Sequence, residues 1–133
     1  MVNKEKLNYF KARENCQSIG GTLFEPQSLS KYRTVYEWAK TFKDDNKWIG
    51  ITSEDTKWVL DSSGFTVNFQ NWDADEPSSE NEKCLEIRKD GKWNDENCDS
   101  SKMSICEFKN SEIFPFLFVV LYEYFKVPCP LLM

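Results

Sequence analysis

The sequence contains no histidine, and this absence narrows the functions open to the chain. Histidine is the commonest general base near neutral pH and a frequent zinc ligand, so its absence removes most hydrolase and zinc-enzyme mechanisms. The sequence also lacks the G-x-S-x-G, P-loop and C-x-x-C motifs. We therefore expect a binding protein and not an enzyme.

Positive charge and long hydrophobic runs are also scarce. The 17 Lys and Arg residues are outnumbered by 22 Asp and Glu residues, and no basic cluster is present. Nucleic acid and anionic membrane surfaces are therefore poor candidate partners. The apolar run from Ile113 to Tyr122 is shorter than the roughly 20 residues of a spanning helix and contains Pro115. We expect no membrane span there.

Acidic and amide side chains gather between Asp75 and Cys98. Two groups of oxygen-bearing side chains flank Cys84 and a short apolar stretch: Glu76, Ser78 and Glu82, then Asn94 and Asp95. The stretch predicts a strand, and Asp90-Gly91 predicts a turn that brings the second group back toward the first. Ca²⁺ takes about 6–8 oxygen ligands of these kinds, whereas acidic loops in general are simply solvated. A cis bond before Pro77 would aim the flanking side chains the same way.

The rest of the chain predicts two helices and one further strand. The first helix carries Tyr9, Ala12, Cys16 and Ile19 at helical spacing and ends at Gly20-Gly21, which suits a C-terminal cap. The second begins at Ser28 or Ser30 and buries Val35, Trp38, Ala39 and Phe42. A buried strand follows at Trp48–Ile51, and ordered loops packed around aromatic residues are expected from 52 to 79.

Landmark residues recur in a fixed order along the chain. These are Trp48-Ile49-Gly50-Ile51, Asn71-Trp72, Glu76-Pro77, Cys84, Trp93-Asn94-Asp95, Cys98 and Ile105-Cys106-Glu107. In this order they resemble the C-type lectin-like domain, with W-I-G-L, E-P-N or Q-P-D, W-N-D and a closing I-C-E, over about residues 7 to 109. The resemblance implies an α+β fold in which two helices pack on small antiparallel sheets beside a long loop region, with two disulfides.

The same resemblance pairs Cys16 with Cys106 and Cys84 with Cys98, and leaves Cys129 unpaired. Each bridge contributes about 2–4 kcal/mol by the chain-entropy estimate. Disulfides persist in oxidising compartments, so we expect a secreted protein or one facing the cell exterior. Reduced cysteines in a cytosolic core are the alternative.

Both ends depart from the family pattern. We assign residues 1–109 to the lectin-like domain, without its first strand, and 110–133 to an apolar tail. The first six residues are polar and do not form a signal peptide, so a fragment, an alternative start or an incomplete gene model is expected. A missing strand would leave an open sheet edge beside the last strand, which the tail could cover. If so, deleting 110–133 would lower the melting temperature.

For function, the resemblance implies a Ca²⁺ site at Glu76, Ser78, Glu82, Asn94 and Asp95, whose side chains would also bind two sugar hydroxyls. Glu-Pro implies mannose, glucose or fucose-type sugars. Serine replaces the family's asparagine at Ser78, which weakens the site, and Ser53 and Lys83 make auxiliary calcium sites doubtful. The alternatives are a calcium-independent protein-binding domain and a truncated, non-functional isoform. The oligomeric state stays open.

Overall fold

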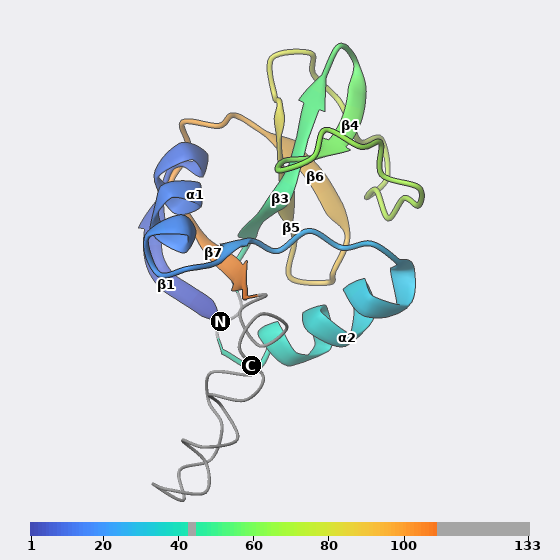
Figure 1. The fold of residues 1–133 in the computed structure, drawn as a ribbon. Coiled ribbons are helices and arrows are strands. Elements are labelled where there is room, and N and C mark those ends of the chain that lie inside the picture. Colours follow the sequence, from blue (N-terminus) through green and yellow to red (C-terminus); the bar gives the residue numbers. More distant parts are fainter. Residues whose placement is uncertain (43–44, 109–133) are drawn as a thin grey trace, which may run out of the picture.

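The computed structural model describes residues 1–42 and 45–108, and Figure 1 shows two helices around a twisted sheet in that part of the chain. The elements in order are β1 Val2–Leu7, α1 Tyr9–Ser18, β2 Thr22–Leu23, α2 Leu29–Ala39, β3 Lys47–Glu54, β4 Lys57–Leu60, β5 Cys84–Ile87, β6 Trp93–Glu96 and β7 Lys102–Glu107. This confirms the expected α+β fold class.

Helix α1 forms where its apolar residues recur at helical spacing. The Asn8 side chain caps it by accepting a hydrogen bond from the backbone N–H of Lys11 at 2.8 Å. Tyr9, Ala12 and Cys16 are buried, which fixes the face that packs on the sheet. Ile19, expected on the same face, is 46% exposed because it lies past the last turn of the helix.

Helix α2 begins after Ser28, whose hydroxyl caps it by accepting from the backbone N–H of Lys31. Its fully buried residues are Tyr32 and Ala39. Tyr32 was not expected in the core, and its hydroxyl donates to the Gly91 carbonyl. Phe42, expected in the buried stripe, is 41% exposed because the helix ends before it.

The sheet runs in the order β1-β7-β3-β5-β6, with β4 beside β3 and β2 beside β7. All pairs are antiparallel except β3 with β7, which is parallel. The described core is built on this sheet, and its largest apolar side chains include Trp48, Ile49, Ile51, Leu85, Trp93 and Ile105. The two disulfides join Cys16 to Cys106 and Cys84 to Cys98, which confirms the expected pairing.

A strand precedes α1, contrary to expectation. β1 pairs antiparallel with β7, with Val2 opposite Ile105, and therefore occupies the edge of β7 that was expected to be open. This strand cannot be recognised from the sequence, because Lys4, Glu5 and Lys6 give it little alternation of apolar and polar residues. The expected role of the apolar tail lies outside the described residues.

Two hairpins build the end of the molecule that carries the predicted site. β5 and β6 pair with Leu85 opposite Asp95, and Gly91 takes a positive φ of +83° in the predicted turn. The β3–β4 hairpin was expected to be loop, and it turns through Asp55 and Thr56, both at positive φ. Strand β4 has only four residues, which is too few for an alternation of apolar and polar residues to be clear in the sequence.

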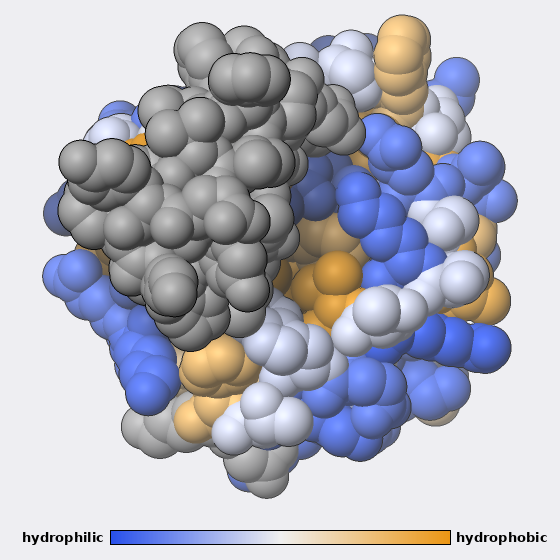
Figure 2. Space-filling model, turned by 60° about the horizontal axis from the view of Figure 1, so that its bottom comes forward, coloured by the Kyte–Doolittle hydropathy of each residue, from blue (hydrophilic) through white to orange (hydrophobic). Residues whose placement is uncertain are grey.

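The opposite end carries an apolar groove of about 520 Å³ between α2 and β7. Phe24, Val35, Trp38 and Ile105 contribute apolar side chains to its lining. Figure 2 views this end and shows apolar residues within a hollow bordered by hydrophilic ones.

Neither helix in the described ranges is long and apolar enough to cross a membrane.

Candidate functional site

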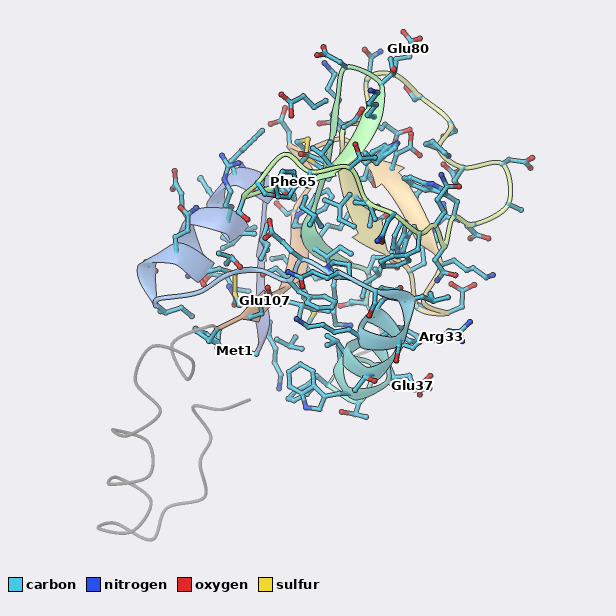
Figure 3. The ribbon with its side chains drawn as sticks, turned by 45° about the vertical axis from the view of Figure 1, so that its right-hand side comes forward. Met1, Arg33, Glu37, Phe65, Glu80 and Glu107 are labelled. Carbon is cyan, nitrogen blue, oxygen red and sulfur yellow. A yellow bond between two sulfur atoms is a disulfide. The ribbon has the colours of Figure 1, made fainter. Side chains whose placement is uncertain are left out.

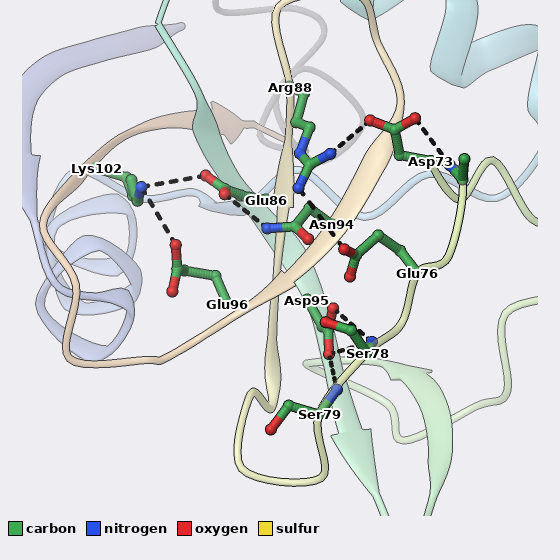
Figure 4. Close-up of polar contacts among 11 residues, drawn as sticks. Asp73, Glu76, Ser78, Ser79, Glu86, Arg88, Asn94, Asp95, Glu96 and Lys102 are labelled. Carbon is green, nitrogen blue, oxygen red and sulfur yellow. Dashed lines mark hydrogen bonds and ion pairs between the residues drawn. The ribbon is translucent and has the colours of Figure 1, made fainter.

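Asp95 lies at the centre of the predicted site. It is fully buried on β6, and its carboxylate accepts hydrogen bonds from two successive backbone N–H groups. Ser78 donates to Oδ1 at 3.1 Å and to Oδ2 at 3.0 Å, and Ser79 donates to Oδ2 at 3.0 Å (Figure 4). These contacts hold the loop after Pro77 against the strand. The Glu76–Pro77 peptide bond in this loop is cis.

Glu76 lies beside Asp95, and the two carboxyl groups titrate as a pair. Hydrogen bonding with Asp95, followed by burial, raises the pKa of Glu76 above its ordinary value. Burial alone would raise the pKa of Asp95, but hydrogen bonds from Glu76 and from the Ser79 and Ser78 backbone lower it. Glu76 therefore takes up a proton more readily than Asp95. When both groups are ionised, two negative charges meet there, which favours a cation.

Glu82 and Ser78 complete this cluster. Burial, and next the charge of Asp95, raises the pKa of Glu82. The Ser78 side chain favours the ionised form of both Glu82 and Glu76, which opposes the rise in each pKa. Glu76 and Ser78 thus lie beside Asp95, and Glu82 lies near enough for the charge of Asp95 to raise its pKa.

Asn94 belongs to a neighbouring polar network. Its amide nitrogen donates to Oε1 of Glu86 on β5 at 3.0 Å, in a buried hydrogen bond. The Lys102 ammonium lies 3.4 Å from Oε2 of Glu86 and 3.4 Å from Oε2 of Glu96. A primary amide has two N–H donors and one carbonyl acceptor, so this bond leaves Asn94 one N–H and its oxygen for a ligand.

Sequence reasoning missed Arg88 and Asp73. Arg88 Nη1 lies 2.5 Å from Asp73 Oδ2, and Arg88 Nη2 lies 3.8 Å from Glu76 Oε1. The hydrogen bond from Arg88 lowers the pKa of Asp73, and the same bond raises the pKa of Arg88. No motif marks these residues, because their meeting depends on how the loop from 72 to 76 crosses the hairpin.

The predicted ligands are of the chemical kinds that Ca²⁺ binds, but their side chains are not grouped as closely as a metal site requires. Three carboxylates, one hydroxyl and one amide are oxygen ligands of the kind that calcium takes. Glu76 Oε2 is buried without a hydrogen-bond partner within the described ranges, which is consistent with an oxygen held for a cation. However, no three His, Cys, Asp or Glu side chains in the described part are grouped closely enough to hold a metal ion. Binding would require the Glu76 and Glu82 side chains to close around Asp95.

The fold and disulfides define an α+β domain with a polar cluster in one of its loops. Residues 5–108 match the family described as the Lectin C-type domain. The chain therefore belongs to the C-type lectin family.

The similar proteins agree on this family and fold. The chain is 38% identical over 107 residues to C-type lectin domain family 3 member A of Mus musculus, covering 76% of this chain and 55% of that protein. The chain thus spans about half the length of the curated relatives that it matches. Among solved structures it resembles human lithostathine (TM-score 0.72, 26% identity, 82% of this chain and 89% of that one). It also resembles the mouse scavenger receptor C-type lectin carbohydrate-recognition domain (TM-score 0.69, 27% identity, 77% and 80%).

Proposed function

We propose that this domain is a calcium-dependent carbohydrate-binding module. The observation that carries the proposal is the meeting of Glu76 and Asp95, with Glu82 close enough to respond to the same charge. Carboxylates brought together at a loop favour a counter-charge; Arg88 supplies part of it at 3.8 Å from Glu76, and a divalent cation would supply more. The expected ligand set is Glu76, Ser78, Glu82, Asn94 and Asp95.

The residues of the set would hold the metal, contact the sugar or anchor the loop. The set would hold a Ca²⁺ ion, which would supply coordination positions for two neighbouring sugar hydroxyls. The carboxylates of Glu76 and Glu82 would accept hydrogen bonds from those hydroxyls, and the remaining N–H of Asn94 would donate one to a sugar oxygen. Asp95 holds the loop through the Ser78 and Ser79 N–H groups, so the loop keeps its place when sugar leaves.

We further propose mannose, glucose or fucose-type sugars as ligands. The support is the Glu76-Pro77 pair, which resembles the E-P-N motif of family members with this preference. Ser78 supplies one short hydroxyl where that motif has an amide, so we expect weak calcium binding of the extracellular type. The two disulfides support a site of action outside the cell.

The test is retention on a mannan column in calcium, followed by elution with a chelator. The wild-type protein is compared with Asp95→Asn, which preserves side-chain size, and with Glu80→Gln as a matched control. Glu80 is exposed on the same loop and points away from the body of the molecule (Figure 3). We expect chelator-sensitive retention of the wild type and of Glu80→Gln, and loss of retention by Asp95→Asn.

Two results would count against this function. Retention that survives the chelator, or equal retention of Asp95→Asn, would exclude a calcium site at Asp95. Retention on galactose but not on mannan would exclude only the sugar class. Arg88 favours the second candidate, a calcium-independent protein-binding domain, because its cation already faces Glu76. In that case the wild-type protein would not bind sugar, so no variant of the site would change retention on mannan.

A further inference from the structure

Arg88 sits at the rim of the proposed site with its positive charge turned toward the site's carboxylates. It follows β5 directly, and its backbone N–H donates to the Lys92 carbonyl at 2.8 Å while its carbonyl accepts from Gly91 N–H at 2.9 Å. Both ends of this residue are therefore fixed in the hairpin turn. Its guanidinium reaches Asp73 and Glu76, as Figure 4 shows.

The segment that receives Arg88 is also anchored. The Asp73 backbone N–H donates to the Trp93 carbonyl at 2.9 Å, and the Glu76 N–H donates to the Asp73 carbonyl at 3.1 Å. Asp73 and Glu76 therefore present their carboxylates on a turn that is tied to β6. With both sides anchored, Arg88 cannot leave Glu76 by a movement of the loop alone.

A cation bound to Glu76 would lie close to this guanidinium. Calcium sits about 2.3–2.6 Å from its oxygen ligands, and Arg88 Nη2 is 3.8 Å from Glu76 Oε1. Two positive charges would then share one carboxylate within a few ångströms. Their repulsion is large in a partly buried site and falls as salt screens it.

We propose that Arg88 is a built-in counter-ion that competes with calcium for Glu76 and so sets the calcium concentration at which the site fills. This inference rests on the proposed function. Asp73 makes the competition partial, because it holds the other guanidinium nitrogen at 2.5 Å and thereby keeps Arg88 from pairing fully with Glu76. Weak calcium affinity would then have two sources, Ser78 and Arg88.

The experiment is calorimetric titration of CaCl₂ into chelator-stripped protein at low salt. The variants are Arg88→Gln, which removes the charge, and Arg88→Lys, which keeps it with a different shape. Arg33→Gln is the control, since Arg33 is an exposed cation on α2 that is not part of the proposed site (Figure 3). We expect Arg88→Gln to bind calcium about tenfold more tightly, consistent with a nearby like charge. Arg88→Lys and Arg33→Gln should stay close to the wild type.

Salt gives a second readout that a purely structural role would not move. The gain from Arg88→Gln should shrink at about 1 M salt, where the Debye length is about 3 Å. Weaker binding by both Arg88→Gln and Arg88→Lys would overturn the proposal and assign Arg88 to positioning the loop. If only Arg88→Gln binds calcium, Arg88 does compete with calcium for Glu76, but the wild-type protein does not function through calcium. No binding by any variant would overturn both.

Discussion

Glu82→Gln should shift thermal stability in opposite directions with and without calcium. The pKa of Glu82 is raised, first by burial and then by the charge of Asp95, so its ionised form is disfavoured in the fold. A group of this kind contributes stability below its unfolded pKa and loses it as pH rises through the folded value. At neutral pH in chelator, glutamine removes the unfavourable charge and retains a hydrogen-bonding partner for Ser78. We therefore expect a higher melting temperature than the wild type.

In calcium, the wild type should melt at a higher temperature than Glu82→Gln. At a concentration of 100 times Kd, a ligand that binds only the folded state stabilises it by about 2.7 kcal/mol, or about 10 °C for a domain near 100 residues. Loss of one of three carboxylates should weaken binding about a hundredfold, because calcium affinity follows ligand charge. The same calcium concentration then equals Kd, and the gain falls to about 0.4 kcal/mol, or about 2 °C.

The assay is differential scanning fluorimetry in chelator and in calcium, with Glu80→Gln as the control. In chelator, the advantage of Glu82→Gln should shrink as pH falls through the folded pKa and vanish below the unfolded pKa, where Glu82 is neutral in both states. The reasoning fails if Glu82→Gln melts below the wild type in chelator, or if both proteins gain equally from calcium.

Three further variants test other parts of the structure. Ser78→Asn restores the amide found in the family motif, and we expect calcium affinity to rise about tenfold, or about 1.4 kcal/mol, by calorimetry; unchanged affinity would show that the serine does not limit the site. Replacing Cys84 and Cys98 by serine opens the loop that carries the site, and urea denaturation should show a loss of about 3 kcal/mol; a loss confined to calcium affinity would contradict this. Gly91→Ala would place a Cβ 2.9 Å from Tyr36 at a φ of +83°, so we expect about 1–3 kcal/mol of destabilisation, and wild-type stability would refute the strain.

The predictable parts of the fold are those with a strong local or covalent signal. Asp90-Gly91 marks a turn because glycine alone adopts its positive φ without strain, and the cysteine order fixes the disulfides once the family is recognised. The helix α1 follows from apolar spacing at Tyr9 and Ala12. These signals need no knowledge of distant segments.

The missed parts depend on segments that are distant in the sequence. β1 has few apolar side chains because it is stabilised by pairing with β7, more than 90 residues later. Tyr32 is buried because the Gly91 carbonyl accepts its hydroxyl. Arg88 meets Asp73 and Glu76 only when the loop folds across the hairpin. Sequence could name the five candidate ligands, but not the cation beside them or the bond from Asn94 to Glu86.

The most direct measurement is a crystal structure grown with CaCl₂ and methyl α-mannoside. We predict one Ca²⁺ about 2.3–2.6 Å from oxygens of the predicted set, with two sugar hydroxyls on the metal and Arg88 withdrawn from Glu76. The ligands expected are Glu76, Ser78 directly or through water, Glu82, Asn94 and Asp95. Crystals with no metal at Asp95, and with Arg88 still paired to Glu76, would contradict calcium-dependent sugar binding by this domain.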